Sequence, residues 1–193
     1  MFAIAITLLV LELQVPESDF EHLSYGIVHQ WPSYLAYVTS FLTIGGIWMA
    51  HHGMFRRLQY ANQRVMVINL LLLMTVSFLP FPTKIMAEAI RSTGPERVAV
   101  IFYGATLLVI SLVLNGLWGS VALDRTLLKP EVTEREFNSI LMETSPTLAF
   151  HGAVIVLAIF APTVAVFGFL VIAIVAVLRV RGDRTSASTT DPG

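Results

Sequence analysis

The residue types and spacing that could act on an ion occur at the very start of the chain, in MFAIAITLLVLEL. Thr7 is the single polar side chain among the first eleven residues. At 100° per residue, one narrow helical stripe holds Ile4, Thr7, Leu8 and Leu11. Two interpretations stay open: a threonine that bonds back to the Ala3 carbonyl, or a ring of hydroxyls facing a pore, which needs several copies of this helix around an axis.

Histidine and asparagine are the other side chains that could carry chemistry. His51 and His52 are adjacent, so on a helix they point about 100° apart and cannot share a metal as an i, i+4 pair does. The other three histidines lie on other segments. We interpret Asn69 and Asn115 as hydrogen-bonding groups between helices rather than as ligands. The pattern therefore favours polar contacts within a bundle over a metal or cofactor site.

Charged and catalytic groups are missing where a transporter or an enzyme would need them. No acidic or basic residue lies well inside an apolar stretch, whereas proton-coupled transporters usually bury a carboxylate. The chain has no cysteine, which excludes thiolate chemistry. It also lacks a TVGYG-like run, which excludes the usual carbonyl-lined potassium filter.

The composition is that of a membrane protein. Of the 193 residues, 55% are hydrophobic and 13% are charged; a soluble domain has about 25% charged residues. The net charge of −1 gives no reason to expect a nucleic-acid partner.

The apolar stretches predict an all-α protein with six spans in one domain, residues 1–180. The run 145–178 is free of charged residues and would be about 51 Å long as one helix, so we interpret it as two spans. Ser145-Pro146 would begin the first of these and Pro162 the second. The polar stretch 124–143 would form a short surface helix, and the tail 181–193 would be disordered. The expected spans are 1–13, 33–54, 65–82, 98–123, 145–161 and 162–178.

The loops predict the orientation in the membrane. Six spans return the chain to the side on which it started, so both termini face the same side. With the N-terminus inside, nine Lys and Arg residues lie inside and three outside, which is a clear positive-inside bias. The three outside are Lys84, Arg91 and Arg97. We therefore expect cytoplasmic termini in the plasma membrane.

Three stretches together resemble one known family. They are FAIAITLLVLEL (Phe2–Leu13), WPSYLAYVTSFLTIGGIWMAHHGMF (Trp31–Phe55) and NLLLLMTVSFLPFPT (Asn69–Thr83). In order and spacing they are similar to the prokaryotic branch of the transmembrane protein 175 family of endosomal and lysosomal potassium channels. That family opens its first helix with a Phe-Ser-x-x-x-Asp signature, which is absent after Met1 here.

The resemblance implies a homotetramer of six-span subunits whose pore is lined by four copies of the first helix, without a P-loop filter. It implies that Ile4, Leu8 and Leu11 match a hydrophobic constriction and that Thr7 matches a threonine layer. The polar residues that would tie the helices together are His51, His52 and Asn69. The implied partners are other copies of the chain, membrane lipid and monovalent cations, with no bound cofactor besides permeant K⁺.

We therefore expect a passive channel that favours potassium and leaks other monovalent cations, and no enzyme activity. Three alternatives remain. A secondary transporter would show saturable, coupled flux. A membrane enzyme would lose turnover when His51 or His52 is changed. A non-conducting or truncated scaffold would carry no flux at all.

Overall fold

The computed structural model describes residues 1–11, 13, 27–91 and 96–186, and this part of the chain is built from helices. Three stretches are long and apolar enough to cross a membrane: Trp31–Arg57, Gln63–Arg91 and Glu96–Leu123. Two shorter apolar helical segments are Thr147–Phe160 and Pro162–Leu178. In chain order the α-helices are α1 (Phe2–Val10), α3 (Trp31–Arg57), α4 (Gln63–Phe78), α5 (Pro80–Arg91), α6 (Glu96–Leu123), α7 (Glu134–Phe160) and α8 (Pro162–Ser186).

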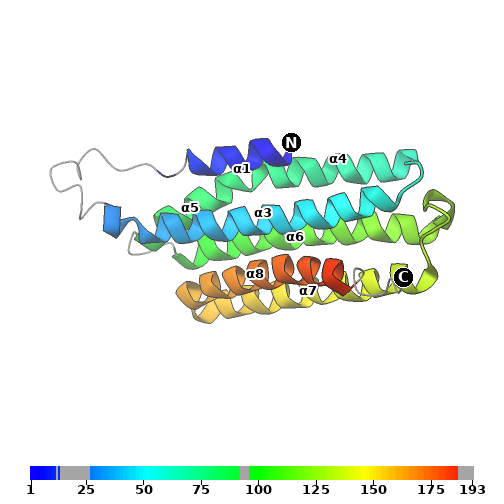
Figure 1. Cartoon of the computed structure of the whole chain (residues 1–193). Coiled ribbons are helices and arrows are strands. Elements are labelled where there is room, and N and C mark those ends of the chain that lie inside the picture. The colour runs from blue at the N-terminus through cyan, green and yellow to red at the C-terminus, as the bar shows by residue number, and fades with distance from the viewer. Residues whose placement is uncertain (12, 14–26, 92–95, 187–193) are drawn as a thin grey trace.

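The helices form one elongated bundle. Figure 1 shows α1 beside α4 and α5 along one side, the α7–α8 pair along the other, and α3 and α6 between them. The contacts agree with this order, because α3 packs on α8 and α5, and α6 packs on α4 and α7. Helix α1 lies on the surface formed by α3, α4 and α5. The expected all-α class is therefore confirmed.

The prolines of the third expected span begin a helix instead of ending one. We expected that span to stop at Pro82, but only Leu79 separates α4 from α5, and the apolar helical run continues to Arg91. Pro80 and Pro82 both lie in the first turn of α5, where backbone amides have no partner within the helix. The proline rings therefore cost little there.

The helix that contains the fifth expected span begins earlier than expected, although its apolar segment is Thr147–Phe160. Helix α7 begins at Glu134 and passes through Ser145-Pro146, so these residues do not cap it. No separate surface helix covers 124–143; a single 3₁₀ turn, η2 (Arg125–Leu127), precedes α7 in that stretch. Residues 134–143 are mostly good helix formers, and elongating a helix costs much less than starting a new one.

Helix α8 begins where the sequence predicted but ends later than expected. Helix α7 ends at Phe160 and α8 begins at Pro162, so the predicted break within the long apolar run is confirmed. At its other end α8 continues to Ser186, so the expected disordered tail does not begin at 181. Residues 187–193 lie outside the described part of the chain, as does the predicted acidic loop over 14–26.

Small residues let the helices approach closely, as expected in lipid, where apolar burial between helices gives little driving force. A Cβ added at Gly104 of α6 would lie 2.7 Å from Phe169 Cζ and 2.8 Å from Ile155 Cγ1. A Cβ added at Gly46 of α3 would lie 3.7 Å from Ala176 and 3.8 Å from Val177 of α8, which is ordinary van der Waals contact. Gly104 is therefore the position where the lack of a side chain lets α7 and α8 approach α6 closely.

Backbone hydrogen bonds join two connections at one end of the bundle. Between α3 and α4, Gln59 N donates to Leu127 O at 2.8 Å, and Lys129 N donates to Arg57 O at 3.0 Å. This is a short antiparallel bridge, with Leu58 opposite Leu128. Figure 1 shows both connections at the same end of the molecule. We call this end, residues 56–64 and 124–133, the clamped end.

The close approach at Gly104 gives a stability prediction. Gly104→Ala should lower the free energy of unfolding by about 1 to 3 kcal/mol, because the buried Phe169 and Ile155 must move. Gly116→Ala in the same helix is the matched control, since a Cβ there meets nothing within 4 Å. Thermal unfolding of the purified protein in detergent measures both. Equal unfolding temperatures for the two variants would contradict this account of the packing.

Candidate pore-lining helix and its tether

Helix α1 has one face turned outward and one face packed. Ile4 and Leu8 of α1 point outward and are 58% and 41% exposed, as is Leu11 directly after its end at 61%, while Leu9 is only 1% exposed. Thr7 is also exposed. The packed face also holds Phe2 and Ala5. The stripe that the sequence singled out thus lies on the exposed side of α1.

The Thr7 hydroxyl bonds to its own helix, one residue nearer than expected. Its Oγ1 donates to the Ile4 carbonyl at 2.9 Å, and not to that of Ala3. A threonine hydroxyl has one proton and two lone pairs, so this bond leaves the oxygen able to accept. An oxygen of this kind, repeated around an axis, can face a cation.

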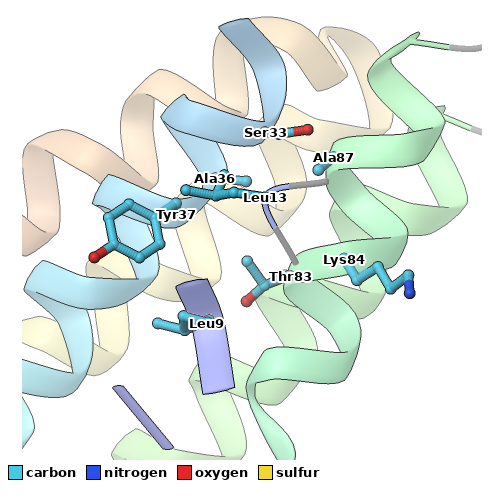
Figure 2. Close-up of a pocket in the computed structure, with 8 residues that line it drawn as sticks. All are labelled: Leu9, Leu13, Ser33, Ala36, Tyr37, Thr83, Lys84 and Ala87. Carbon is cyan, nitrogen blue, oxygen red and sulfur yellow. The ribbon is translucent and has the colours of Figure 1, made fainter. Parts of the chain in front are cut away.

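Tight contacts fix the position of α1. Leu9 and Ala5 belong to the continuous apolar core that also contains Ala36 of α3 and Val76 of α4. Behind α1 remains a small pocket with Leu9 on one side and Ala36 and Thr83 on the others. Figure 2 shows these side chains coming from α1, α3 and α5 respectively. The packed face of α1 therefore follows the groove between α3 and the α4–α5 run.

His51 joins three helices near the start of α1. Its Nε2 donates to Asn69 Oδ1 of α4 at 2.7 Å, and its ring lies 5.2 Å from that of Phe2, between centroids. His51 and Asn69, which the sequence analysis grouped, are therefore in contact. His52 is not: its exposed ring stacks on Trp48 of its own helix, with centroids 5.4 Å apart.

Asn115 does not form the hydrogen bond between helices that we expected. Its Nδ2 donates to the Ser111 carbonyl at 2.8 Å, within α6 and not between helices. The neighbouring Ser111 hydroxyl instead lies 3.3 Å from Nδ1 of the buried His151 in α7. Among the described residues no group of three or more His, Asp or Glu could hold a metal ion.

A buried chain of hydroxyls was missed by the sequence analysis. Ser40 Oγ of α3 lies 2.8 Å from Thr83 Oγ1 of α5 and 3.0 Å from the Tyr103 hydroxyl of α6. Thr83 donates to the Leu79 carbonyl at 2.8 Å. One assignment of the hydroxyl protons satisfies all three bonds: Tyr103 donates to Ser40, and Ser40 donates to Thr83. The available signal was hydroxyl residues within apolar stretches, but such residues usually bond to their own helix.

The tether at His51 gives the second prediction. Asn69→Leu keeps the branching of the side chain but leaves His51 Nε2 without its partner on α4, so it should cost about 1 kcal/mol of stability. Asn115→Leu is the matched control, because it removes a bond within one helix. Unfolding temperatures in detergent should be lowered more by Asn69→Leu. A larger effect of Asn115→Leu would show that the His51 tether is not a principal contact.

Comparisons with known proteins agree on one family. A family model described as the endosomal/lysosomal potassium channel TMEM175 matches residues 1–80. A protein of Streptomyces collinus named as a potassium channel is 39% identical over 133 residues, which is 68% of this chain and 65% of that protein. One of Chamaesiphon minutus, also named as a potassium channel, is 40% identical over 144 residues, 72% of this chain and 70% of its own length.

More distant relatives and a solved structure extend the comparison. An endosomal/lysosomal proton channel TMEM175 of Danio rerio is 28% identical over 127 residues, which is 61% of this chain but 24% of that protein. The crystal structure of a lysosomal potassium-selective channel TMEM175 homologue from Chamaesiphon minutus matches with a TM-score of 0.83 and 35% identity. It covers 93% of this chain, and the match covers 92% of the solved chain.

Proposed function

Because this chain belongs to the TMEM175 family, we propose that it is a potassium channel whose pore is lined by several copies of α1. One observation carries the proposal: α1 packs one face into its own subunit and leaves Ile4, Leu8 and Leu11 exposed on the other. Lipid would cover the apolar side chains equally well, so the polar group among them distinguishes this stripe. The exposed Thr7 lies in the same stripe, and symmetry mates around an axis would turn its hydroxyl toward a pore and away from lipid.

The proposed assembly is a homotetramer of six-span subunits. In this account α4 and α5 count as one span, since the apolar helical run is continuous from Gln63 to Arg91. Together with α1, α3, α6, α7 and α8 this makes six. The four-fold arrangement rests on the family resemblance, and the solved relative of similar length supports the subunit fold.

The proposed selectivity depends on two kinds of side chain in the same stripe. Rings of Ile4, Leu8 and Leu11 are apolar, so a narrow pore between them would lose its water and hold back hydrated ions. A ring of Thr7 oxygens would replace part of the lost hydration and would favour the more easily dehydrated potassium ion. Other monovalent cations would leak because the oxygens form no rigid cage.

The proposed role is passive conduction in the plasma membrane, with both termini in the cytoplasm. The relatives are channels and not enzymes, and no step of covalent chemistry is assigned to the chain. His51 and Asn69 serve in this proposal as a tether that holds the start of α1 against α3 and α4.

The pore proposal predicts separate effects for the two kinds of residue. Thr7→Val keeps the shape of the side chain and removes the oxygen, so the ratio of potassium flux to sodium flux should fall severalfold. Leu11→Ala widens the constriction, so flux of both ions should rise severalfold. Liposomes containing the purified protein, with potassium or sodium gradients, measure both quantities.

The matched control for Leu11→Ala is an exposed leucine outside α1. Leu112 of α6 is 53% exposed, and Leu112→Ala should leave flux unchanged. Leu9, on the opposite face of α1, is unsuitable, because its burial means that Leu9→Ala tests packing. If Leu112→Ala raises flux as much as Leu11→Ala, or if Thr7→Val leaves the ion ratio unchanged, the stripe does not line the pore.

The orientation is tested with single cysteines, which the natural chain lacks. Arg97→Cys should react with a membrane-impermeant thiol reagent on intact cells, and Arg64→Cys only after the membrane is opened. Both side chains are exposed, so burial does not limit labelling. Labelling of the cysteine at 64 but not at 97 on intact cells would reverse the proposed topology.

A further inference from the structure

Cations from two separate connections meet at the clamped end. Arg56 and Arg57 occupy the last turn of α3, Arg64 the first turn of α4, and Lys129 follows η2. The side chains of Arg56, Arg64 and Lys129 are exposed. Arg57 Nη1 donates to the Gly53 carbonyl at 3.0 Å.

Backbone hydrogen bonds join the two connections that carry these cations, although the connections are far apart in the sequence. The bond from Lys129 N to Arg57 O, at 3.0 Å, makes the two residues direct neighbours. The Tyr60 hydroxyl adds a side-chain bond by donating to Thr126 Oγ1 at 3.0 Å. Positive charges carried by joined connections repel one another, so an anion bound at this end would stabilise the arrangement.

Acidic groups at this end neutralise the cations only in part. Asp124 accepts a bond from the Thr126 hydroxyl at 2.6 Å, and Glu134 pairs with Arg125 at 3.3 Å. Glu131 is the one further acidic side chain described in 56–64 and 124–134. Among these described residues, the cations of Arg56, Arg64 and Lys129 therefore outnumber the acidic side chains that are not paired with Arg125, which are Asp124 and Glu131.

Helix electrostatics explain the cations of α3 but not that of α4. Arg56 and Arg57 lie at a helix C-terminus, where positive charge is favourable. Arg64 lies in the first turn of α4, which holds no acidic residue and where a cation is unfavourable. An external anion would compensate for this cost.

We propose that the clamped end binds the phosphate groups of anionic membrane lipids. Its cations lie where the long apolar runs of α3 and α4 end, which is the level of lipid headgroups in a bilayer. Tyr60, 51% exposed at the same end, is of the type enriched at membrane interfaces. The adjoining apolar helices provide a surface for the acyl chains, which selects a lipid over free phosphate.

The test uses the whole protein in phosphatidylcholine nanodiscs with increasing fractions of phosphatidylglycerol. Binding of phosphatidylglycerol is measured as a shift in the unfolding temperature of the protein. Phosphatidylglycerol should raise the unfolding temperature of the natural protein. In the double variant Arg56→Gln, Arg64→Gln the apparent affinity should fall about 25-fold, at about fivefold for each cation. Arg97→Gln, an exposed cation in the first turn of α6, is the matched control and should bind as the natural protein does.

Three results would overturn the proposal: no effect of phosphatidylglycerol on the natural protein, an equal loss in Arg97→Gln, or an equal shift from inorganic phosphate in pure phosphatidylcholine. The last result would identify a site for free anions. If the double variant unfolds earlier than the natural protein in phosphatidylcholine alone, Lys129→Gln replaces it. An affinity loss of about fivefold is then expected, and an unchanged affinity would overturn the proposal.

Discussion

The hydrocarbon core of a bilayer offers no hydrogen-bond partners, and this constraint organises the described part of the molecule. Helices satisfy the backbone internally, so the polar side chains within them decide which helices meet. The Ser40, Thr83 and Tyr103 hydroxyls connect α3, α5 and α6. His51 and Asn69 connect α3 to α4. Each of these groups would be costly to expose to lipid without its partner.

The two polar contacts lie on opposite sides of Leu79, the residue between α4 and α5. The His51–Asn69 bond lies on the α4 side of Leu79, and the Ser40–Thr83 contact on the α5 side. Both attach this run to the single long helix α3. Because α1 packs on α3, α4 and α5 together, the same two contacts define the groove in which α1 lies. The outward direction of the proposed pore stripe follows from that groove.

Packing elsewhere in the bundle depends on the absence of side chains. Gly104 allows Phe169 and Ile155 to approach the backbone of α6, and the Phe169 ring in turn lies 5.4 Å from that of Tyr103, between centroids. The α7–α8 pair is thereby joined to the hydroxyl chain of α3, α5 and α6. A continuous set of contacts thus extends from the outer helix pair to the helices that support α1.

The sequence by itself determined the helical class, the stripe Ile4, Thr7, Leu8 and Leu11, and the break at Pro162, because hydrophobic length and the 100° helical angle are local properties. It could not determine the ends of α5, α7 and α8, since prolines can begin a helix and polar residues can continue one. Only the tertiary structure decided that His51, and not His52, contacts Asn69. It also decided that Ser40 bonds between helices while Asn115 bonds within its own. The physical reason is that a polar side chain in a span can form a hydrogen bond either within its own helix or with a neighbouring helix. Only the relative rotation of the packed helices selects between the two.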